Sequence, residues 1–351
     1  MSNTDPEFVI IGENIHATRV LMRKNARVVL DEEGEEAIAF VDESGATRHL
    51  RVTEEEKRTQ PYSEGRIKHV KLAVQVARGS DETDRSVALS YLSMLARRQV
   101  DSGARFLDVN LDELSNDLGE QVRAMRFLVG VLAPLVEVPL AIDSSSLDIL
   151  RAGLEAAVEA AGARLGPPML NSASLERTGV LELAAEIDGP VVVSAAGERG
   201  LPNDAEERVS NAGRMIEAAL AAGIKPERVF VDPLVFPIAV NSESGPDCLD
   251  AISEIRRRHG DEIHITGGMS NVSFGLPGRR LLNDAFLVLA IEAGADSGIV
   301  DPTTLNIEQV LRSDRSSRPF QLAIDVLTGV DSNCRSYMKA YRAGELTPPA
   351  P

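Results

Sequence analysis

Short apolar runs recur along the chain, and each ends in a cluster of polar or glycine residues before a longer segment begins. The longer segments carry apolar residues at the spacing of a helix face, as in Arg85–Ser102, where Ala88, Leu92 and Leu95 fall on one side. This alternation of short apolar runs with helical segments is typical of βα units. The pattern therefore predicts an α/β protein.

Eight of these runs fit the description of a strand. They are Phe8–Glu13, Arg105–Asn110, Pro139–Asp143, Pro168–Asn171, Pro190–Ala195, Val229–Pro233, Ile263–Gly267 and Ser297–Asp301. The helical segments include Gln121–Leu132, Leu147–Ala161, Ala205–Ala222 and Leu281–Ala293. Eight such units favour a closed (β/α)8 TIM barrel over an open doubly wound sheet. No GxGxxG sequence follows the first run, as a dinucleotide-binding fold would require.

One segment, Arg27–Val52, interrupts this alternation in the first βα connection. Three β-rich runs are separated by two acidic turns that end in glycine, at residues 31–34 and 42–45. This pattern predicts a small antiparallel β-meander, inserted within about residues 27–60. The insertion could cap the barrel mouth, dock a partner, or lie on the surface without a role in the chemistry.

Length and composition fit a globular protein in water. The chain has 351 residues, of which 43% are apolar and 26% charged. We expect the barrel to span residues 1–330, followed by a C-terminal helix and tail at residues 331–351. The formal net charge of −17 argues against a nucleic-acid partner, because non-specific binding to phosphates needs clustered Lys and Arg.

The cysteines and the apolar runs bear on the compartment. Cys248 and Cys334 lie far apart, so the sequence contains neither a disulfide framework nor a CxxC metal site. The N-terminus lacks a basic segment followed by an apolar one, and no apolar run is long enough to span a bilayer. We expect a cytoplasmic protein without a membrane partner.

Polar residues end nearly every predicted strand, and the active site of such a barrel lies at that end. They are Glu13, Asn14, Asp108, Asn110, Asp143, Asn171, Ser194, Asp232, Asn271 and Asp301. This set lacks Lys, a reactive Cys or a His cluster, so it is poorly suited to nucleophilic chemistry or a tightly held transition metal. It suits hydrogen bonds to a polar heterocycle such as a pterin, whose 2-amino-4-oxo edge could pair with Asp232 and Asn171.

Each of these residues also has an ordinary structural explanation. Asp and Asn after a strand often cap the next helix, and the segment Asp143–Ser146 fits an N-cap cluster. For any one of these residues taken alone, capping is the simpler interpretation. A functional role therefore depends on several of them being considered together.

Six ordered segments resemble the methyltetrahydrofolate:corrinoid methyltransferases, which are related in fold to dihydropteroate synthase and to the folate domain of cobalamin-dependent methionine synthase. The segments are Ile11–Asn14, Leu107–Asn110, Ile142–Ser145, Leu170–Ser174, Val231–Leu234 and Gly268–Ser273. Dihydropteroate synthase itself is less similar, since it carries a phosphate-binding Ser-Arg-Lys where this chain has Ser270-Asn271-Val272. A pyrophosphate leaving group needs such cations, whereas methyl transfer does not.

The resemblance implies an enzyme that moves a methyl group between N5 of (methyl)tetrahydrofolate and the cobalt of a corrinoid, a cobalamin, carried by a partner protein. It assigns these residues to folate binding: Glu13, Asp108, Asn110, Asp143, Asn171, Asp232, Gly268, Ser270, Asn271 and Arg279. Asn271 would donate a hydrogen bond to N5 in the transition state, together with Asp143 as the second catalytic residue. No protein-bound metal is expected, and relatives often form homodimers.

Some features depart from the family or leave alternatives open. The family commonly has Gly-Glu-Arg-x-Asn after the first strand, whereas this chain has Gly-Glu-Asn-Ile-His, which makes His16 either a functional residue or a plain loop histidine. Residues 262–267 approximate a cobalt-ligating Asp-x-His-x-x-Gly element, but we expect His264 to be a core residue of the seventh strand. A non-catalytic pterin-binding barrel, a dihydropteroate synthase-like enzyme and a metal-dependent lyase using Asp108, Asp143 and Asp301 remain alternatives. The direction of transfer is not encoded.

Overall fold

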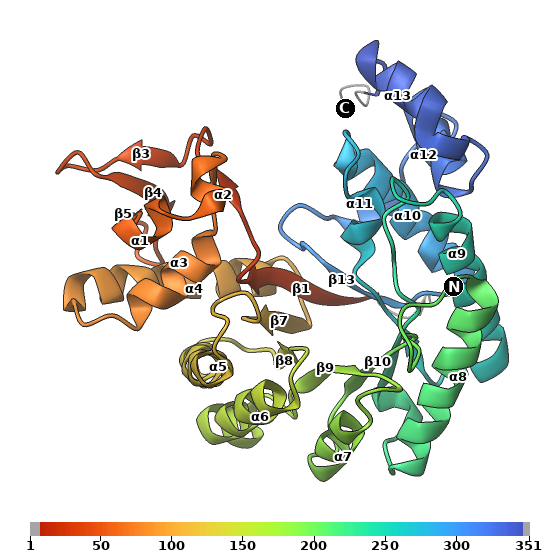
Figure 1. Cartoon of the computed structure of the whole chain (residues 1–351), viewed down its shortest axis with the longest axis horizontal. Coiled ribbons are helices and arrows are strands. Elements are labelled where there is room, and N and C mark those ends of the chain that lie inside the picture. Colours follow the sequence, from red (N-terminus) through yellow and green to blue (C-terminus); the bar gives the residue numbers. More distant parts are fainter. Residues whose placement is uncertain (1–7, 347–351) are drawn as a thin grey trace, which may run out of the picture. The chain divides into compact units, whose positions relative to one another are not determined.

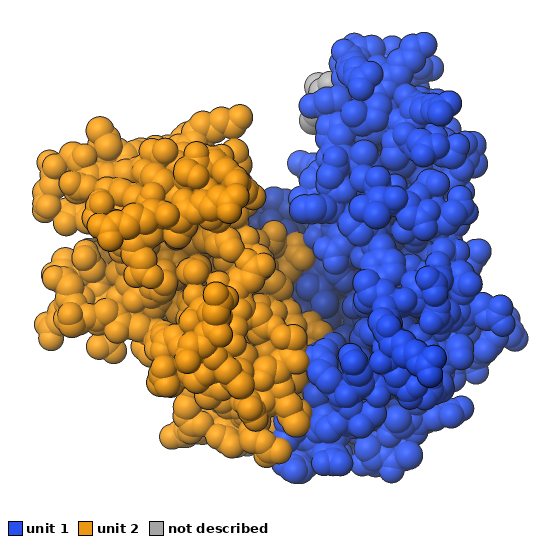
Figure 2. Space-filling model, viewed as in Figure 1, with its two compact units in different colours: residues 1–11, 172–351 blue, residues 12–171 orange. Residues whose placement is uncertain are grey.

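The computed structural model describes residues 8–346, which form two compact units (Figure 2). One unit is Gly12–Asn171, and the other combines Met1–Ile11 with Ser172–Pro351. The N-terminal residues 1–7 and the last part of the predicted tail, residues 347–351, lie outside the described residues.

Eight strands form one sheet, whose order is β12-β11-β10-β9-β8-β7-β1-β13. The strands are β1 (Val9–His16), β7 (Phe106–Asn110), β8 (Leu140–Asp143), β9 (Met169–Ala173), β10 (Val191–Ser194), β11 (Val229–Asp232), β12 (His264–Ile265) and β13 (Ser297–Val300). A parallel bridge between Gly268 and Ile299 links the segment after β12 to β13, the two ends of this order. The predicted (β/α)8 fold and its eight strands are confirmed.

The first strand is longer than the sequence suggested. The prediction ended it at Glu13 and treated the next residues as a loop, whereas β1 continues to His16. The continuation is explained by Ile15 and Ala17, which are fully buried and carry the apolar pattern of the strand past the polar pair Glu13 and Asn14. His16 therefore lies at the carboxyl end of a strand.

Helices separate the strands in both units. In Gly12–Asn171 they are α1 (Glu54–Lys57), α2 (Gln60–Ser63), α3 (His69–Ala77), α4 (Glu82–Asp101), α5 (Leu118–Leu132) and α6 (Leu147–Ala161), and α5 and α6 run side by side next to β7 and β8 in Figure 1. The other unit holds α7 (Gly179–Glu186), α8 (Ala205–Ala221), α9 (Ser244–His259), α10 (Arg279–Ala293), α11 (Ile307–Leu311), α12 (Arg318–Leu327) and α13 (Arg335–Arg342). Short 3-10 helices are η1 (Gly162–Arg164), η2 (Pro226–Arg228), η3 (Met269–Ser273) and η4 (Ser332–Cys334). Within residues 8–346, none of the helices has the length and apolarity needed to cross a bilayer.

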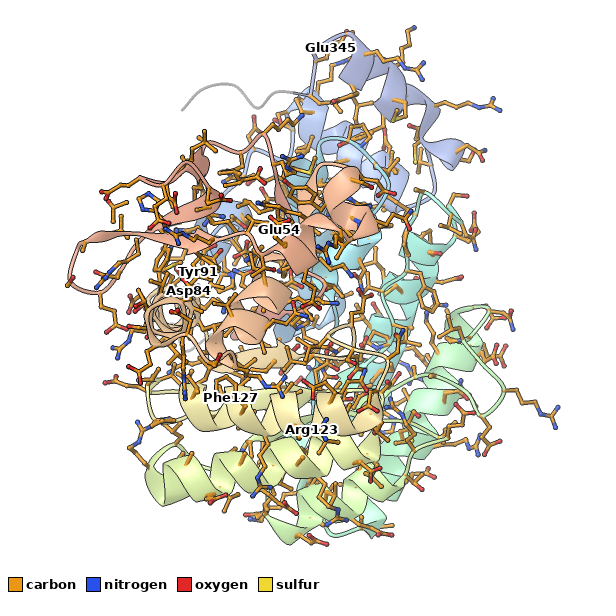
Figure 3. All side chains as sticks on the ribbon, turned by 60° about the vertical axis from the view of Figure 1, so that its left-hand side comes forward. Glu54, Asp84, Tyr91, Arg123, Phe127 and Glu345 are labelled. Atoms are coloured by element: carbon orange, nitrogen blue, oxygen red, sulfur yellow. The ribbon has the colours of Figure 1, made fainter. Side chains whose placement is uncertain are left out.

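The insertion after β1 contains a three-stranded antiparallel sheet of β3 (Val28–Leu30), β4 (Glu36–Val41) and β5 (Thr47–Arg51), preceded by β2 (Leu21–Met22), which pairs with β6 (Arg66–Ile67). Each of its two turns is organised by an aspartate, because Asp31 and Asp42 accept backbone N–H groups two and four residues ahead. The sheet packs on α4 of the same unit. Tyr91 of α4, labelled in Figure 3, meets Phe40 edge to face at a centroid distance of 5.0 Å.

Candidate active site

Three polar residues form a row across neighbouring strands of the Gly12–Asn171 unit. The strand register pairs Asn110 of β7 with Asp143 of β8, and Asp143 with Asn171 of β9. Adjacent parallel strands lie about 4.8 Å apart, so paired residues present neighbouring side chains on one face. Asn110 donates a hydrogen bond through Nδ2 to Asp143 Oδ2 at 2.9 Å. The row is therefore connected by side chains as well as by register.

Asp108 adds a second level to this row. It lies two residues before Asn110 on β7, hence on the same face, and it is fully buried. Its Oδ1 accepts a hydrogen bond from Asn171 Nδ2 at 3.1 Å. Its Oδ2 lies 2.5 Å from His16 Nε2 at the end of β1. One carboxylate thus connects three strands through two hydrogen bonds.

The environment of this cluster raises the pKa of both Asp143 and His16. Burial, reinforced by the negative charge of Asp108, raises the pKa of Asp143 to about 8. Burial alone would lower the pKa of His16, but the hydrogen bond and charge of Asp108, with the charges of Asp143 and Glu13, outweigh it and raise that pKa. Both Asp143 and His16 therefore hold their protons more tightly than the free side chains would.

The helix-capping explanation for Asp143 does not account for its contacts. The helix that follows, α6, begins after Ser146, whose backbone N–H donates to Ser144 Oγ at 3.1 Å. Ser144 Oγ in turn donates to Asp112 Oδ1 at 2.6 Å, and the N–H of Ser145 donates to Asp112 Oδ2 at 2.8 Å. Asp112 and Ser144 thus organise the start of α6, while Asp143 is engaged with Asn110.

Glu13 has a different environment from the other predicted residues of this unit. Its Oε1 is 2.8 Å from Arg19 Nη2, and Arg19 Nε donates to the Glu13 carbonyl at 3.0 Å. Arg19 also donates to Asn14 Oδ1 at 2.8 Å. Arg19 therefore holds Glu13 and Asn14 near the end of β1 through hydrogen bonds and an ion pair. Glu13 also contributes negative charge near His16.

The other unit holds a second group of predicted residues, centred on Asp232 at the end of β11. Asp232 Oδ1 accepts the N–H of Leu234 at 2.8 Å. Burial raises the pKa of Asp232 to about 6. Gly267 lies directly against it, since a Cβ at Gly267 would stand 3.1 Å from Asp232 Oδ1, and its φ of +156° suits glycine. The carboxylate is therefore closely covered on one side by backbone.

Asn271 is next to this position, on η3. A Cβ at Gly268 would come within 2.8 Å of Asn271 Nδ2, so glycine at 268 is what allows the amide to lie there. Consecutive glycines thus contact Asp232 and Asn271. Arg279 holds the same turn, because its Nη2 donates to the Ser270 carbonyl at 2.8 Å and its Nε to Ser273 Oγ at 3.0 Å. The side chain of Asn271 itself is exposed.

His16, Asp108 and Asp143 could offer one ligand atom each to a metal ion, since these atoms lie within 4.8 Å of one another. His16 and Asp108 are joined by a hydrogen bond, which a cation between them would have to replace. Asp301, the third residue of the alternative metal set, accepts the N–H and hydroxyl of Thr303 in its own turn.

The ten residues predicted for the site divide equally between the units. Glu13, Asp108, Asn110, Asp143 and Asn171 lie in Gly12–Asn171, and Asp232, Gly268, Ser270, Asn271 and Arg279 lie in the other unit. The sequence did not decide whether His16 has a functional role, because the predicted first strand ended at Glu13, three residues before it. Arg208, in the first turn of α8, is buried, and no local sequence pattern indicated this.

His264 makes two side-chain contacts. Its Nδ1 is 2.9 Å from Asp296 Oδ2, and its ring stacks on Phe230 at a centroid distance of 4.3 Å. Both contacts hold the ring within the packing of β11 and β12.

The sequence and the structure of this chain are similar to those of several known proteins. The family model described as pterin binding enzyme matches residues 79–301. A methylcorrinoid:tetrahydrofolate methyltransferase of Eubacterium limosum is 29% identical over 289 residues, which cover 81% of this chain and 95% of that protein. Methionine synthases of Mycobacterium leprae and Mycobacterium tuberculosis are each 33% identical over 221 residues, 59% of this chain but 17% and 18% of theirs. Dihydropteroate synthase of Xanthomonas albilineans with 4-aminobenzoic acid aligns with a TM-score of 0.50 and 20% identity, over 66% of this chain and 86% of that chain, which shows the fold alone.

Proposed function

Because the chain belongs to the pterin binding enzyme family, we propose that it is a methyltransferase acting between N5 of tetrahydrofolate and the cobalt of a corrinoid protein. The observation that carries this proposal is the similarity to the methylcorrinoid:tetrahydrofolate methyltransferase, which extends over 95% of that protein. The methionine synthases are similar only over a small part of their length, so their whole reaction is not transferred to this chain.

The buried polar residues suit a pterin. Its 2-amino-4-oxo edge carries N–H donors and a carbonyl acceptor, which carboxylates and carboxamides can pair with. We assign Asn171 and Asp143 to this role from their place in the row of hydrogen-bonded side chains. Asp232 is assigned from its motif and from its buried carboxylate. These residues would bind and orient the ring.

The protonated acid at Asp143 supports the chemistry at N5. When a methyl group leaves N5, the nitrogen keeps the bonding electron pair and must take up a proton. Asp143 holds a proton at neutral pH because of its burial and the charge of Asp108. In the opposite direction the ionised Asp143 would accept the N5 proton. The corrinoid supplies the cobalt that accepts or donates the methyl group.

Asn271 is the second residue that we assign to the reaction. An amide cannot act as a general acid, so its contribution is a hydrogen bond to N5 that strengthens in the transition state. Its exposed side chain and the glycine at 268 that accommodates it fit this role. Gly268 and Ser270 would line the same part of the substrate site, and Arg279 would keep the turn in place.

The corrinoid is proposed to arrive on a separate protein. The only sequence that approximates a cobalt-ligating element is at His264, and that side chain is engaged with Asp296 and Phe230. We further propose a cytoplasmic homodimer, from the family resemblance and the absence of a membrane-spanning helix among the described residues. Light scattering of the purified protein tests the dimer.

The function is tested by following the methyl group itself. The purified chain is incubated anaerobically with N5-[13C]methyltetrahydrofolate and cob(I)alamin, and 13C NMR reports whether the label moves from nitrogen to cobalt. We expect transfer that depends on the protein. A chain that binds tetrahydrofolate without transferring the label would be a pterin-binding module, and one that does neither would contradict the proposal.

A further inference from the structure

The last helix of the described chain, α13, carries a fully buried tyrosine, Tyr337. Its hydroxyl donates to two consecutive backbone carbonyls, those of Pro277 at 3.2 Å and Gly278 at 3.3 Å. Both carbonyls lie immediately before α10, far from Tyr337 in the sequence. A buried phenol needs a partner for its O–H, and here the partner is the start of α10.

The glycine at 278 shows how closely α13 approaches this point. Gly278 has a left-handed φ of +66°, and a Cβ there would stand 2.7 Å from the Tyr337 hydroxyl oxygen. The same Cβ would be 3.8 Å from Cδ1 of Leu346, which is also buried. Residues of α13 and of the segment after it therefore pack directly against the N-cap position of α10.

Tyr337 is itself held at the start of its own helix. Asp331 Oδ2 accepts the backbone N–H of Tyr337 at 2.9 Å, and Asp331 Oδ1 accepts that of Ser336 at 3.1 Å. These N–H groups lie in the first turn of α13, where the helix itself offers no acceptor. The hydroxyl is therefore presented to α10 from a capped helix.

The start of α10 is in turn tied to the turn that carries Asn271. Arg279 is the first residue of α10 and follows Gly278 directly. Its guanidinium donates to the Ser270 carbonyl at 2.8 Å and to Ser273 Oγ at 3.0 Å, and Ser273 Oγ also donates to the Ser270 carbonyl at 3.2 Å. Ser270 and Ser273 lie on either side of Asn271. Printed contacts thus connect α13 to this turn through the first residue of α10.

We propose that Tyr337 is a positioning residue for the methyl transfer, which holds the start of α10 so that Arg279 keeps the Asn271 amide in place. The inference rests on the proposed function, in which Asn271 donates a hydrogen bond to N5. The ordinary explanation is that Tyr337 only anchors α13. A residue with that role alone would change the stability of the protein and leave turnover unaltered.

The first test removes the hydroxyl and keeps the buried ring. A neutral hydrogen bond contributes up to about tenfold, so Tyr337→Phe should lower kcat for transfer from methyltetrahydrofolate to cob(I)alamin by about fivefold. The KM for the folate should stay within about twofold, because the residues assigned to the pterin ring are unaltered. Tyr341→Phe is the matched control, since Tyr341 lies on the same helix and is 47% exposed. Its kcat should equal that of the unaltered protein.

The second test asks whether Tyr337 acts through Asn271. In Asn271→Ala there is no amide left to position, so adding Tyr337→Phe should change kcat by less than about twofold. A fall of about fivefold in both backgrounds would show that Tyr337 acts elsewhere and would overturn the inference. Thermal unfolding followed by circular dichroism distinguishes a loss of folded protein from a loss of turnover.

The outcomes separate the inference from the function. If the unaltered protein transfers the methyl group and Tyr337→Phe keeps its kcat, the inference is wrong and the proposed function stands. If Tyr337→Phe does not fold, Asp331→Ala takes its place, because it removes the cap that holds Tyr337. That variant should lower kcat only where Asn271 is present, and an unchanged kcat overturns the inference. If the unaltered protein transfers no methyl group, both are wrong.

Discussion

His16 Nε2 and Asp108 Oδ2 lie 2.5 Å apart, joining the end of β1 to the middle of β7. Asp108 is fully buried and also accepts a hydrogen bond from Asn171. Its two carboxylate oxygens thus contact an imidazole and an amide. Asp143 stands in the same cluster, where its charge would face that of Asp108. Burial raises the pKa of Asp143 most, Asp108 adds to this rise, and His16 opposes it.

Replacing His16 should change the pH dependence of the reaction. His16 carries positive charge that lowers the pKa of Asp143 against the effect of burial. In His16→Gln that charge is gone, so Asp143 should keep its proton to a higher pH. The alkaline midpoint of the rate profile for methyltetrahydrofolate demethylation should move upward. His49→Gln, in β5 of the insertion, is the control, and equal profiles for both variants would show that His16 has no electrostatic role.

The pH profile of the unaltered enzyme should report Asp143 itself. The acid donates its proton when N5 loses the methyl group, so this direction should slow as pH rises through about 8. The opposite direction needs the carboxylate and should speed up over the same range. Asp143→Asn cannot titrate and should lose both dependences along with most of the rate, on the order of 10²-fold. A pH dependence that survives in this variant would assign the titration to another group.

A side chain at position 268 should displace the Asn271 amide. A methyl group at 268 would stand within 2.8 Å of Asn271 Nδ2, which forces the amide to move. Gly268→Ala should therefore lower turnover by about tenfold or more, with a smaller effect on folate affinity. Gly130→Ala is the matched control, because nothing lies within 4 Å of a Cβ there and helix α5 should gain about 0.5–1 kcal/mol. Normal turnover in Gly268→Ala would show that the position of the Asn271 amide does not matter for catalysis.

Chelation should leave the activity intact. The three potential ligand atoms of His16, Asp108 and Asp143 include a histidine and an aspartate that already share a short hydrogen bond. Overnight dialysis against EDTA should therefore not change the transfer rate, with elemental analysis run on the same sample. A loss of activity restored by a divalent cation would favour the metal-dependent alternative.

The fold was accessible from the sequence because each strand is a short apolar run that ends in a polar residue. The register then explains why Asn110, Asp143 and Asn171 come together, since they are register partners on adjacent strands, although only the first two end their strands. The position of His16 was not accessible in the same way. Glu13 and Asn14 interrupt the apolar run, and only the burial of Ile15 shows that the strand continues.

Other features depend on three-dimensional packing that no local pattern records. Arg208 follows three residues of a typical acidic helix start, a position where arginines are usually exposed, yet it is buried beside Phe236 and Asp247. Asp112, and not Asp143, holds the residues before α6, because it accepts hydrogen bonds from Ser144 and Ser145. Neither relationship follows from spacing along the chain.

A single-turnover absorbance measurement tests whether a methyl group is transferred on a folate held by this chain. Cob(I)alamin is mixed anaerobically with methyltetrahydrofolate and the unaltered protein or Asn271→Ala, with folding checked by circular dichroism. We expect conversion to methylcobalamin with the unaltered protein, and a rate lower by about 10²-fold with the variant. No conversion with the unaltered protein, or equal rates for the two proteins, would contradict the account.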